Sequence, residues 1–176
     1  MTREHELSRF SIEPLAETHN REAFSCGIEA LDFYLRKQAG QDARKRAAVP
    51  FIATPDGKTI AGYYTLSQYT AKLTAIPGEI AKKLSRYPLV SATLLGRLAV
   101  STAFHGIGLG ALLLMDALHR SHTLSKQIAS AGVVVDAKDD RALGFYRKYG
   151  FIDLPNIERR LFLSMGTVEQ LFRKSR

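Results

Sequence analysis

Three glycines at alternate positions, Gly106, Gly108 and Gly110, follow an apolar stretch that ends at Val100. Glycine adopts backbone conformations closed to other residues, so this spacing predicts a sharp turn whose N–H groups come close to a ligand. A helix that begins near Gly108 would point the positive end of its dipole at the same place. The segment therefore predicts a phosphate-binding turn between a strand and a helix, with a tight connection that binds nothing as the alternative.

Two other phosphate-binding motifs do not fit these residues. A Walker A loop needs a Lys-Ser or Lys-Thr pair after its last glycine, and Ala111 and Leu112 stand there instead. A dinucleotide-binding fingerprint opens its domain and is followed, about 20 positions on, by an acidic residue at the end of a second strand. This turn lies in the middle of the chain and is followed by no such residue, so neither motif is indicated.

The pattern of apolar residues predicts the elements that hold this turn. An apolar strand over 91–100 leads into it, an apolar helix through Leu118 follows it, and 132–136 is a second strand of the buried type. The other predicted elements are an edge strand at 10–15, a helix at 28–39, a hairpin of 49–53 with 59–66, a short helix or loop at 79–84, a helix at 139–149 ended by Gly150, strands at 151–152 and 160–165, and a C-terminal helix opened by a capping box at 167–170. Together they predict a mixed α/β or α+β fold with a central, partly parallel sheet.

The composition is ordinary for one globular domain, which we expect to span residues 1–176. A single cysteine, Cys26, excludes an internal disulfide framework and a cysteine-rich zinc site. His119 and His122 lie three residues apart without an evident third ligand, so we expect no metal. The N-terminus is polar and no apolar run approaches the roughly 20 residues of a membrane span, so we expect a cytoplasmic protein with no membrane partner.

The formal net charge of +8 indicates attraction to polyanions. The densest positive region contains Lys37, Arg44 and Lys45, and Lys82 and Lys83 form a second basic pair. Lys37 and Arg44 are seven residues apart and share a helix face if the helix continues between them. A nucleic-acid contact and an ordinary solvated helix face are both compatible with this charge.

Two segments of the chain combine into a recognisable pattern. One contains Arg97–Val100 and His105–Gly110, and the other contains Ala142, Phe145-Tyr146 and Gly150-Phe151. Together they resemble the acetyl-coenzyme A binding core of the GNAT acetyltransferase superfamily. The resemblance implies a GNAT fold and acetyl-coenzyme A (acetyl-CoA) as co-substrate, with no metal. The cofactor-binding residues that it implies are Leu98, Ala99, Val100, His105, Gly106, Ile107, Gly108, Leu109, Gly110, Ala111 and Asp139.

The resemblance covers nearly the whole chain. Residues 26–35, 62–66, 95–100 and 160–165 look like those of the GNAT toxins of bacterial type II toxin–antitoxin modules. This implies that the protein acetylates the α-amine of aminoacyl-tRNA and so stops translation. It also implies a ribbon-helix-helix antitoxin as partner, contact with operator DNA only through that antitoxin, and a homodimer. The basic charge suits a tRNA substrate, because backbone phosphates dominate such affinity.

Three positions depart from the family pattern. His105 stands where the family has Gln or Arg, and Ile107 stands where relatives often carry a basic residue. The turn therefore supplies less fixed positive charge, and its N–H groups and the helix dipole must bind more of the pyrophosphate. Asp139 stands where relatives often have Asn, and an ionised carboxylate accepts a hydrogen bond but cannot donate one.

The mechanism that the resemblance implies begins with attack of a free α-amine on the thioester carbonyl. A backbone N–H of 98–100 would hold the oxyanion, and Tyr146 is the candidate general acid, because an unperturbed tyrosine has a pKa of about 10 and is protonated at neutral pH. A core aromatic on an amphipathic helix is the alternative for Tyr146, and Tyr149, one turn on, lacks the motif position. The candidate tRNA-binding cations are Arg97, Lys37, Arg44, Lys45, Lys82 and Lys83, with a structural ion pair as the alternative for Arg97.

Three functions remain open at this point. The first is a tRNA-directed acetyltransferase toxin, and the second is a GNAT enzyme that acetylates a protein N-terminus, a polyamine or another small amine. The positive charge of the chain counts against a polyamine, because like charges repel. The third is a weakly catalytic GNAT domain that acts mainly through its antitoxin and operator DNA.

Overall fold

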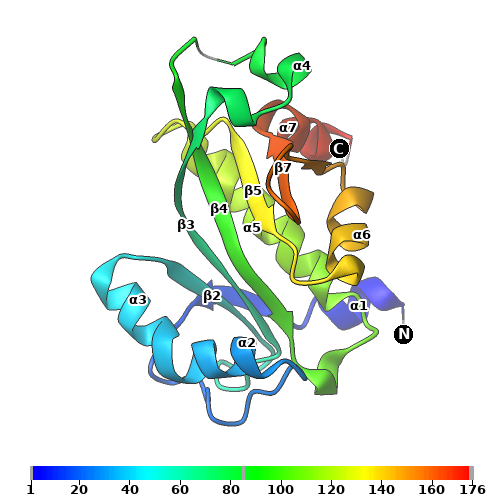
Figure 1. Cartoon of the computed structure of the whole chain (residues 1–176). Coiled ribbons are helices and arrows are strands. Elements are labelled where there is room, and N and C mark those ends of the chain that lie inside the picture. Colours follow the sequence, from blue (N-terminus) through cyan, green and yellow to red (C-terminus); the bar gives the residue numbers. More distant parts are fainter. Residues whose placement is uncertain (1, 85, 175–176) are drawn as a thin grey trace. The chain divides into compact units, whose positions relative to one another are not determined.

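The computed structural model describes residues 2–84 and 86–174, whose strands form one seven-stranded sheet in the order β1-β2-β3-β4-β5-β7-β6 (Figure 1). The strands are β1 (Ser11–Pro14), β2 (Val49–Thr54), β3 (Gly62–Lys72), β4 (Leu89–Val100), β5 (Gly132–Asp136), β6 (Ile152–Asp153) and β7 (Arg160–Ser164). Strands β4 and β5 run parallel, whereas β1–β2, β2–β3, β5–β7 and β6–β7 are antiparallel. The predicted mixed, partly parallel sheet of an α+β fold is confirmed.

The helices connect these strands and follow most of the predicted bounds. They are α1 (Arg3–Leu7), α2 (Glu29–Phe33), α3 (Ala39–Lys45), α4 (Gly78–Ala81), α5 (Leu109–Ser125), α6 (Asp140–Lys148) and α7 (Met165–Arg173), with a π-helical turn η1 (Tyr34–Gln38) and 3-10 turns η2 (Leu73–Ala75) and η3 (Thr102–Phe104). Helix α1 and the π-helical turn were not predicted from the sequence. None of these helices has the length and apolar character needed to cross a membrane within the described ranges.

The described residues fall into two compact units. The first unit is drawn from 1–67 and 96–117, and the second is drawn from 68–95 and 118–176. In the first unit, Tyr34, Leu35, Ile52 and Tyr63 belong to one buried cluster. In the second unit, buried clusters form around Val134 and Phe162 and around Ile76 and Val90. Each unit therefore has apolar packing of its own.

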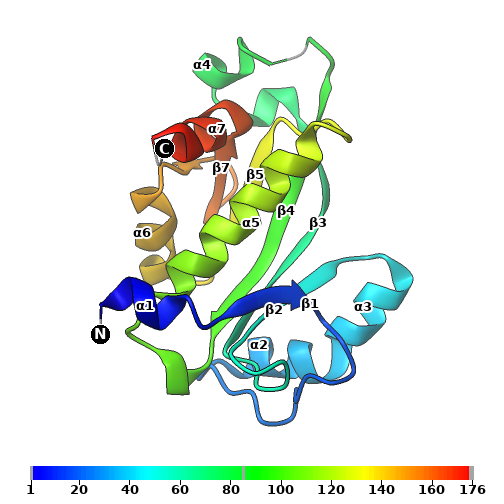
Figure 2. The ribbon, with the colours of Figure 1, turned by 180° about the vertical axis from the view of Figure 1, so that it is seen from behind.

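The first unit contains the predicted edge strand and hairpin. Strand β1 lies at the edge of the sheet and pairs with β2 from Ser11↔Thr54 to Pro14↔Phe51. The N-terminal segment runs from α1 into β1 alongside β2 (Figure 2). Proline is tolerated at such an edge because its missing N–H removes no ladder hydrogen bond.

The second unit confirms the helix at 139–149 and corrects the start of the last helix. Gly150, with φ of 92°, follows α6 in the left-handed conformation that commonly ends a helix. Helix α7 begins at Met165 rather than at Thr167, because Ser164 ends β7 in extended conformation and its side chain accepts a hydrogen bond from Thr167 N. The predicted capping box at 167–170 is therefore wrong, and Ser164 is the N-cap.

Candidate functional site

The predicted glycine turn lies in the first unit, between the end of β4 and the start of α5. After the short turn η3, Gly106 and Gly108 have φ of 80° and 92°, and α5 begins at Leu109. These left-handed conformations are rarely adopted by residues with a side chain, so both glycines are required by the backbone. A Cβ atom at Gly106 would meet no described atom within 4 Å, which leaves that side of the turn open to a ligand.

Gly110 has a different role from the one that its spacing predicts. It lies in the first turn of α5 and is not among the glycines with positive φ in the described chain. A Cβ atom added there would lie 3.8 Å from Val100 Cγ2, an ordinary van der Waals contact. The prediction that Gly110 helps to turn the backbone is therefore wrong, because the turn is complete before this residue.

The turn is anchored to neighbouring strands and loops of the first unit. Ser101 N donates to the carbonyl of Ala61 at 2.8 Å, and Thr102 N donates to the carbonyl of Ser25 at 2.9 Å. Ala99 and Leu109 are buried on the two sides of the turn. The cofactor residues predicted at 98–100 and 105–111 thus form one continuous strand, turn and helix, which gives the turn a fixed backbone.

His105 is turned back toward the strand that precedes it. Its Nε2–H donates to the carbonyl oxygen of Val100 at 2.9 Å, across an exposed part of the turn. This proton is therefore used to hold the backbone of the turn together. Histidine at this position therefore does not bring the permanent charge that an arginine would bring.

Arg3, on α1, brings a positive charge that sequence reasoning missed. Its Nε donates to the carbonyl oxygen of Ile107 at 3.2 Å. A Cβ atom built on Gly108 would lie 3.1 Å from Arg3 Nε and 3.2 Å from Nη2, so the guanidinium lies against the turn itself. The two residues of the hydrogen bond are 104 positions apart, and no local pattern in the sequence points to their contact.

Arg97 stacks on an aromatic ring in the first unit. Its Cζ lies 3.6 Å from the centroid of the Tyr34 ring, and Tyr34 Oη donates to Asp42 Oδ2 at 2.9 Å. Burial, followed by the hydrogen bond to Asp42, raises the pKa of Tyr34 to about 12. Among the described residues no ion pair of Arg97 is found, so the structural alternative for Arg97 is a cation–π stack rather than the predicted ion pair.

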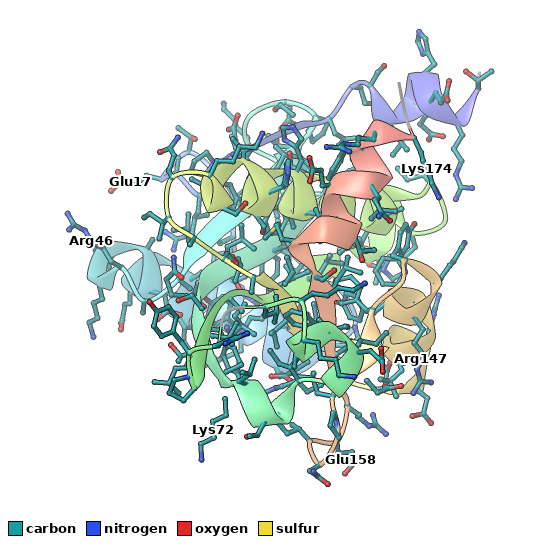
Figure 3. The ribbon with its side chains drawn as sticks, turned by 90° about the horizontal axis from the view of Figure 1, so that it is seen from above. Glu17, Arg46, Lys72, Arg147, Glu158 and Lys174 are labelled. Atoms are coloured by element: carbon teal, nitrogen blue, oxygen red, sulfur yellow. The ribbon has the colours of Figure 1, made fainter. Side chains whose placement is uncertain are left out.

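The basic residues predicted near α3 lie on an exposed helical stretch. The helical stretch continues through Gly40, which is the condition for Lys37 and Arg44 to share a helix face. A Cβ atom at Gly40 would lie 2.8 Å from Arg21 Nη1, so the Arg21 side chain lies against this stretch. Arg21 therefore joins this group, which sequence reasoning missed. We call Arg21, Lys37, Arg44, Lys45 and Arg46 the basic cluster; Arg46 projects outward at the end of α3 (Figure 3).

Only one member of the basic cluster has an ion-pair partner among the described residues. Lys37 Nζ lies 3.8 Å from Glu22 Oε1, and both side chains are mostly exposed. Such a surface pair is worth little, since water and salt screen it. The cluster therefore keeps most of its positive charge available to an anionic partner.

In the second unit, Tyr146 is held in an aromatic group on α6. Its ring centroid lies 5.3 Å from that of Phe145 and 5.5 Å from that of Phe151, and burial raises the pKa of the Tyr146 phenol. No hydrogen bond of its hydroxyl to another described residue is found, and no completely enclosed polar side-chain atom in the described residues lacks a partner. The Tyr146 hydroxyl is therefore not completely enclosed, although the residue is buried, and it stays protonated at neutral pH.

The other predicted site residues of the second unit are a helix N-cap, Asp139, and two exposed lysines, Lys82 and Lys83. Asp139 is the N-cap of α6, with Oδ1 accepting from Ala142 N at 2.8 Å. Lys82 and Lys83 are exposed after α4, and Lys82 Nζ lies 3.9 Å from Glu79 Oε1. Asp139 thus uses one carboxylate oxygen within its own helix, and its expected cofactor contact stays a prediction.

The structure offers no candidate metal centre in residues 2–84 and 86–174. No group of three or more His, Cys, Asp and Glu side chains is placed to hold an ion there. His119 contacts Phe172, with ring centroids 5.3 Å apart. In the first unit the glycine turn with Arg3 suits phosphate binding, and in the second unit the protonated Tyr146 suits proton donation.

Known proteins similar to this chain include acetyltransferases. Residues 26–160 match the family model described as an acetyltransferase (GNAT) domain. The chain is 28% identical to a probable toxin TacT of Sinorhizobium fredii, over 91% of this chain and 93% of that protein. It is 32% identical to a tRNA-acetylating toxin of Mycobacterium tuberculosis, over 85% of this chain and 88% of that protein.

Solved structures with the same fold include the toxin AtaT. AtaT complexed with acetyl-methionyl-tRNAfMet has a TM-score of 0.86 and 29% identity, covering 93% of this chain and 99% of that chain. A tyrosine-to-phenylalanine mutant of AtaT bound to the C-terminus of the antitoxin AtaR and acetyl-CoA has a TM-score of 0.79 and 26% identity, covering 93% and 98%. The AtaT–AtaR complex bound to DNA has a TM-score of 0.74 and 28% identity, covering 92% and 99%.

Proposed function

Because the chain belongs to the GNAT acetyltransferase family, whose model matches residues 26–160, we propose that it transfers the acetyl group of acetyl-CoA to the α-amine of aminoacyl-tRNA. The observation that carries the proposal is the likeness to AtaT in complex with acetyl-methionyl-tRNAfMet, which covers 93% of this chain. The likeness to a tRNA-acetylating toxin supports the same substrate class. We infer that the protein is a toxin that blocks translation.

The glycine turn is the proposed site of the acetyl-CoA pyrophosphate. Its left-handed glycines and the N-terminus of α5 present backbone N–H groups, and the open side at Gly106 leaves room for phosphate. Helix α5 has 17 residues, long enough for a full dipole at its N-terminus. The acetyl thioester would then extend along the end of β4, where residues 98–100 supply the proposed oxyanion contact.

The proposed reaction needs one proton donor. A neutral α-amine attacks the thioester carbonyl carbon, the carbon–sulfur bond breaks, and the thiolate of coenzyme A takes a proton from Tyr146. The new amide nitrogen releases its extra proton to solvent, and the Tyr146 phenolate recovers a proton from solvent. A tyrosine with its ordinary pKa of about 10 is already protonated at neutral pH, and burial raises the pKa of Tyr146 further, so the phenol holds its proton before each turnover.

The proposed tRNA contacts are cationic side chains. Lys37, Arg44 and Lys45 belong to the basic cluster of the first unit, and Lys82 and Lys83 are exposed in the second. Each neutralises a phosphate by a mainly electrostatic contact, which salt weakens. Arg97 is proposed to contact the substrate with its guanidinium held over the Tyr34 ring.

The proposed partner is an antitoxin of the ribbon-helix-helix type. An antitoxin partner is supported by AtaT, which has been solved with the C-terminus of the antitoxin AtaR and, as an AtaT–AtaR complex, with DNA. The ribbon-helix-helix type is what the family resemblance implies. We infer that this chain is neutralised in the same way and that it meets operator DNA only through its antitoxin. A homodimer, as the family resemblance implies, also stays a prediction.

The deciding experiment supplies the purified protein with labelled acetyl-CoA and three acceptors: charged tRNA, uncharged tRNA and spermidine. Label is expected in charged tRNA alone, and base hydrolysis of the aminoacyl ester should release it as N-acetyl amino acid. Label in spermidine alone would replace the proposal with a small-amine acetyltransferase. Binding of acetyl-CoA without transfer to any acceptor would favour a domain that acts through its antitoxin.

A further inference from the structure

We propose that Arg3 supplies the positive charge with which the glycine turn binds the diphosphate of acetyl-CoA. The inference rests on the proposed function, because it assumes that acetyl-CoA binds at this turn. It assigns a role to an N-terminal residue of a short helix that lies far from the turn in the sequence. It also explains how a turn without a cation of its own holds a doubly charged group.

The turn itself carries no fixed charge. Ile107 is apolar, and the Nε2 proton of His105 is engaged by the carbonyl of Val100. The N–H groups and the helix dipole attract an anion only through partial charges. A full positive charge beside the turn would therefore add a substantial part of the attraction for diphosphate.

Arg3 is the side chain that brings this charge to the turn. Its Nε donates to the Ile107 carbonyl at 3.2 Å, and its guanidinium lies 3.1 to 3.4 Å from where a Cβ of Gly108 would be. A guanidinium has five N–H donors, and the Ile107 carbonyl is the one described acceptor that it reaches. The remaining donors are available to a phosphate oxygen.

The charge of Arg3 is not neutralised by the protein around it. Within the described residues no carboxylate lies at ion-pair distance from its guanidinium, although Glu4 and Glu6 belong to the same short helix. The hydrogen bond to Ile107 restricts where the exposed side chain lies. Arg3 is therefore both charged and held at the turn before a ligand arrives.

A purely structural role is the competing explanation. The bond from Arg3 could serve only to attach α1 to the turn and to fix the Ile107 peptide. Two substitutions separate the roles: Arg3→Gln keeps an N–H donor and loses the charge, whereas Arg3→Lys keeps the charge and loses the planar fork. Arg9→Gln is the matched control, because it removes one charge from the same N-terminal segment. The Arg9 guanidinium lies over the rings of Phe10 and Phe104, 4.9 and 6.0 Å from their centroids, whereas the Arg3 guanidinium lies against Gly108.

The test measures the dissociation constant of acetyl-CoA by calorimetry at low and high salt. We expect Arg3→Gln to weaken binding about fivefold at low salt, with a smaller difference at high salt, because screening reduces an exposed charge contact. Arg3→Lys should recover most of the affinity, and Arg9→Gln should bind like the unmodified protein. With S-acetylpantetheine as donor, which lacks the diphosphate, kcat/KM for charged tRNA should be the same with and without Arg3→Gln.

Three outcomes would overturn the inference. Unchanged acetyl-CoA affinity in Arg3→Gln would remove the role of its charge. An equal loss with S-acetylpantetheine would show a structural role only. A loss that does not depend on salt would likewise contradict a charge contact. If the unmodified protein fails to bind acetyl-CoA, the proposed function fails and this inference falls with it, an outcome distinct from the other three.

Discussion

At the scale of single residues, Tyr146 carries the sharpest catalytic prediction. The change Tyr146→Phe removes only the hydroxyl and keeps the ring packing against Phe145 and Phe151. We expect kcat for acetylation of charged tRNA to fall about 100-fold, the usual contribution of a general acid, with KM for acetyl-CoA nearly unchanged. Steady-state kinetics with labelled acetyl-CoA measures both constants.

Tyr149→Phe is the matched control for this prediction. Tyr149 lies one turn further along the same chain segment, and its ring contacts Phe145 at a centroid distance of 5.3 Å. Its loss should change kcat by less than about threefold, because it stands outside the motif position. Equal kcat values for Tyr146→Phe and the unmodified protein would remove Tyr146 from the mechanism.

Single residues were predicted from the sequence only where a local motif names them. Tyr146 precedes the Gly150-Phe151 pair of the family motif, so its helix and position were predictable. Arg3 was not, because its contact with Ile107 joins residues 104 positions apart and depends on how the chain folds back. The hydrogen bond from His105 to Val100 was also beyond sequence reasoning, because the identity of a residue does not fix where its ring lies.

At the scale of elements, the glycine turn contains two glycines that its backbone requires, Gly106 and Gly108, and a third, Gly110, that only continues their spacing. Gly108→Ala places a side chain at φ of 92° and a Cβ atom 3.1 Å from Arg3 Nε. We expect this change to lower the free energy of unfolding by about 1–2 kcal/mol and to weaken acetyl-CoA binding. Urea denaturation and calorimetric titration measure the two effects.

Gly110→Ala is the comparison that makes this prediction specific. Its Cβ atom would meet Val100 Cγ2 at 3.8 Å, and alanine favours a helix over glycine by about 1 kcal/mol. The variant should therefore be as stable as the unmodified protein or more stable. Destabilisation as large as that of Gly108→Ala would show that the turn extends into α5.

Elements with strong local signals were predicted from the sequence, and weakly marked ones were not. The strand at 132–136 has the predicted bounds, because a run of buried β-branched residues specifies it. The π-helical turn at 34–38 was missed, since its hydrogen bonds shift by one residue while the apolar pattern of the helix persists. Ser164 was assigned only to a strand, although it is also the N-cap of α7.

The π-helical turn has a consequence for Arg97. Tyr34 is its first residue, and the same ring packs beside Tyr63, with centroids 6.3 Å apart, and beneath the Arg97 guanidinium. The hydrogen bond to Asp42 fixes the tyrosine from α3. One irregular element thus holds an aromatic surface in place, and the surface orients the arginine proposed to contact substrate.

At the scale of the whole molecule, buried tyrosines couple stability to pH in both units. Burial raises the pKa of Tyr34 to about 12 and raises those of Tyr63 and Tyr146 further. Above pH 10 the unfolded chain releases these protons while the native chain keeps them, so the native state holds more protons. Stability that is complete below about pH 10 must then be lost as pH rises toward the native pKa values.

We therefore expect the free energy of unfolding to be lower at pH 11 than at pH 9, with each shielded tyrosine contributing a slope of up to about 1.4 kcal/mol per pH unit. Tyr34→Phe removes one such group and should flatten the slope, whereas Tyr87→Phe, at a residue 74% exposed, should leave it unchanged. Urea denaturation at the two pH values measures the slope, and the ultraviolet absorbance of tyrosinate counts how many of the 7 tyrosines have ionised at each pH. Equal stability at both pH values would mean that these hydroxyls ionise in the native state as readily as in the unfolded chain, which would contradict the raised pKa values that burial gives them.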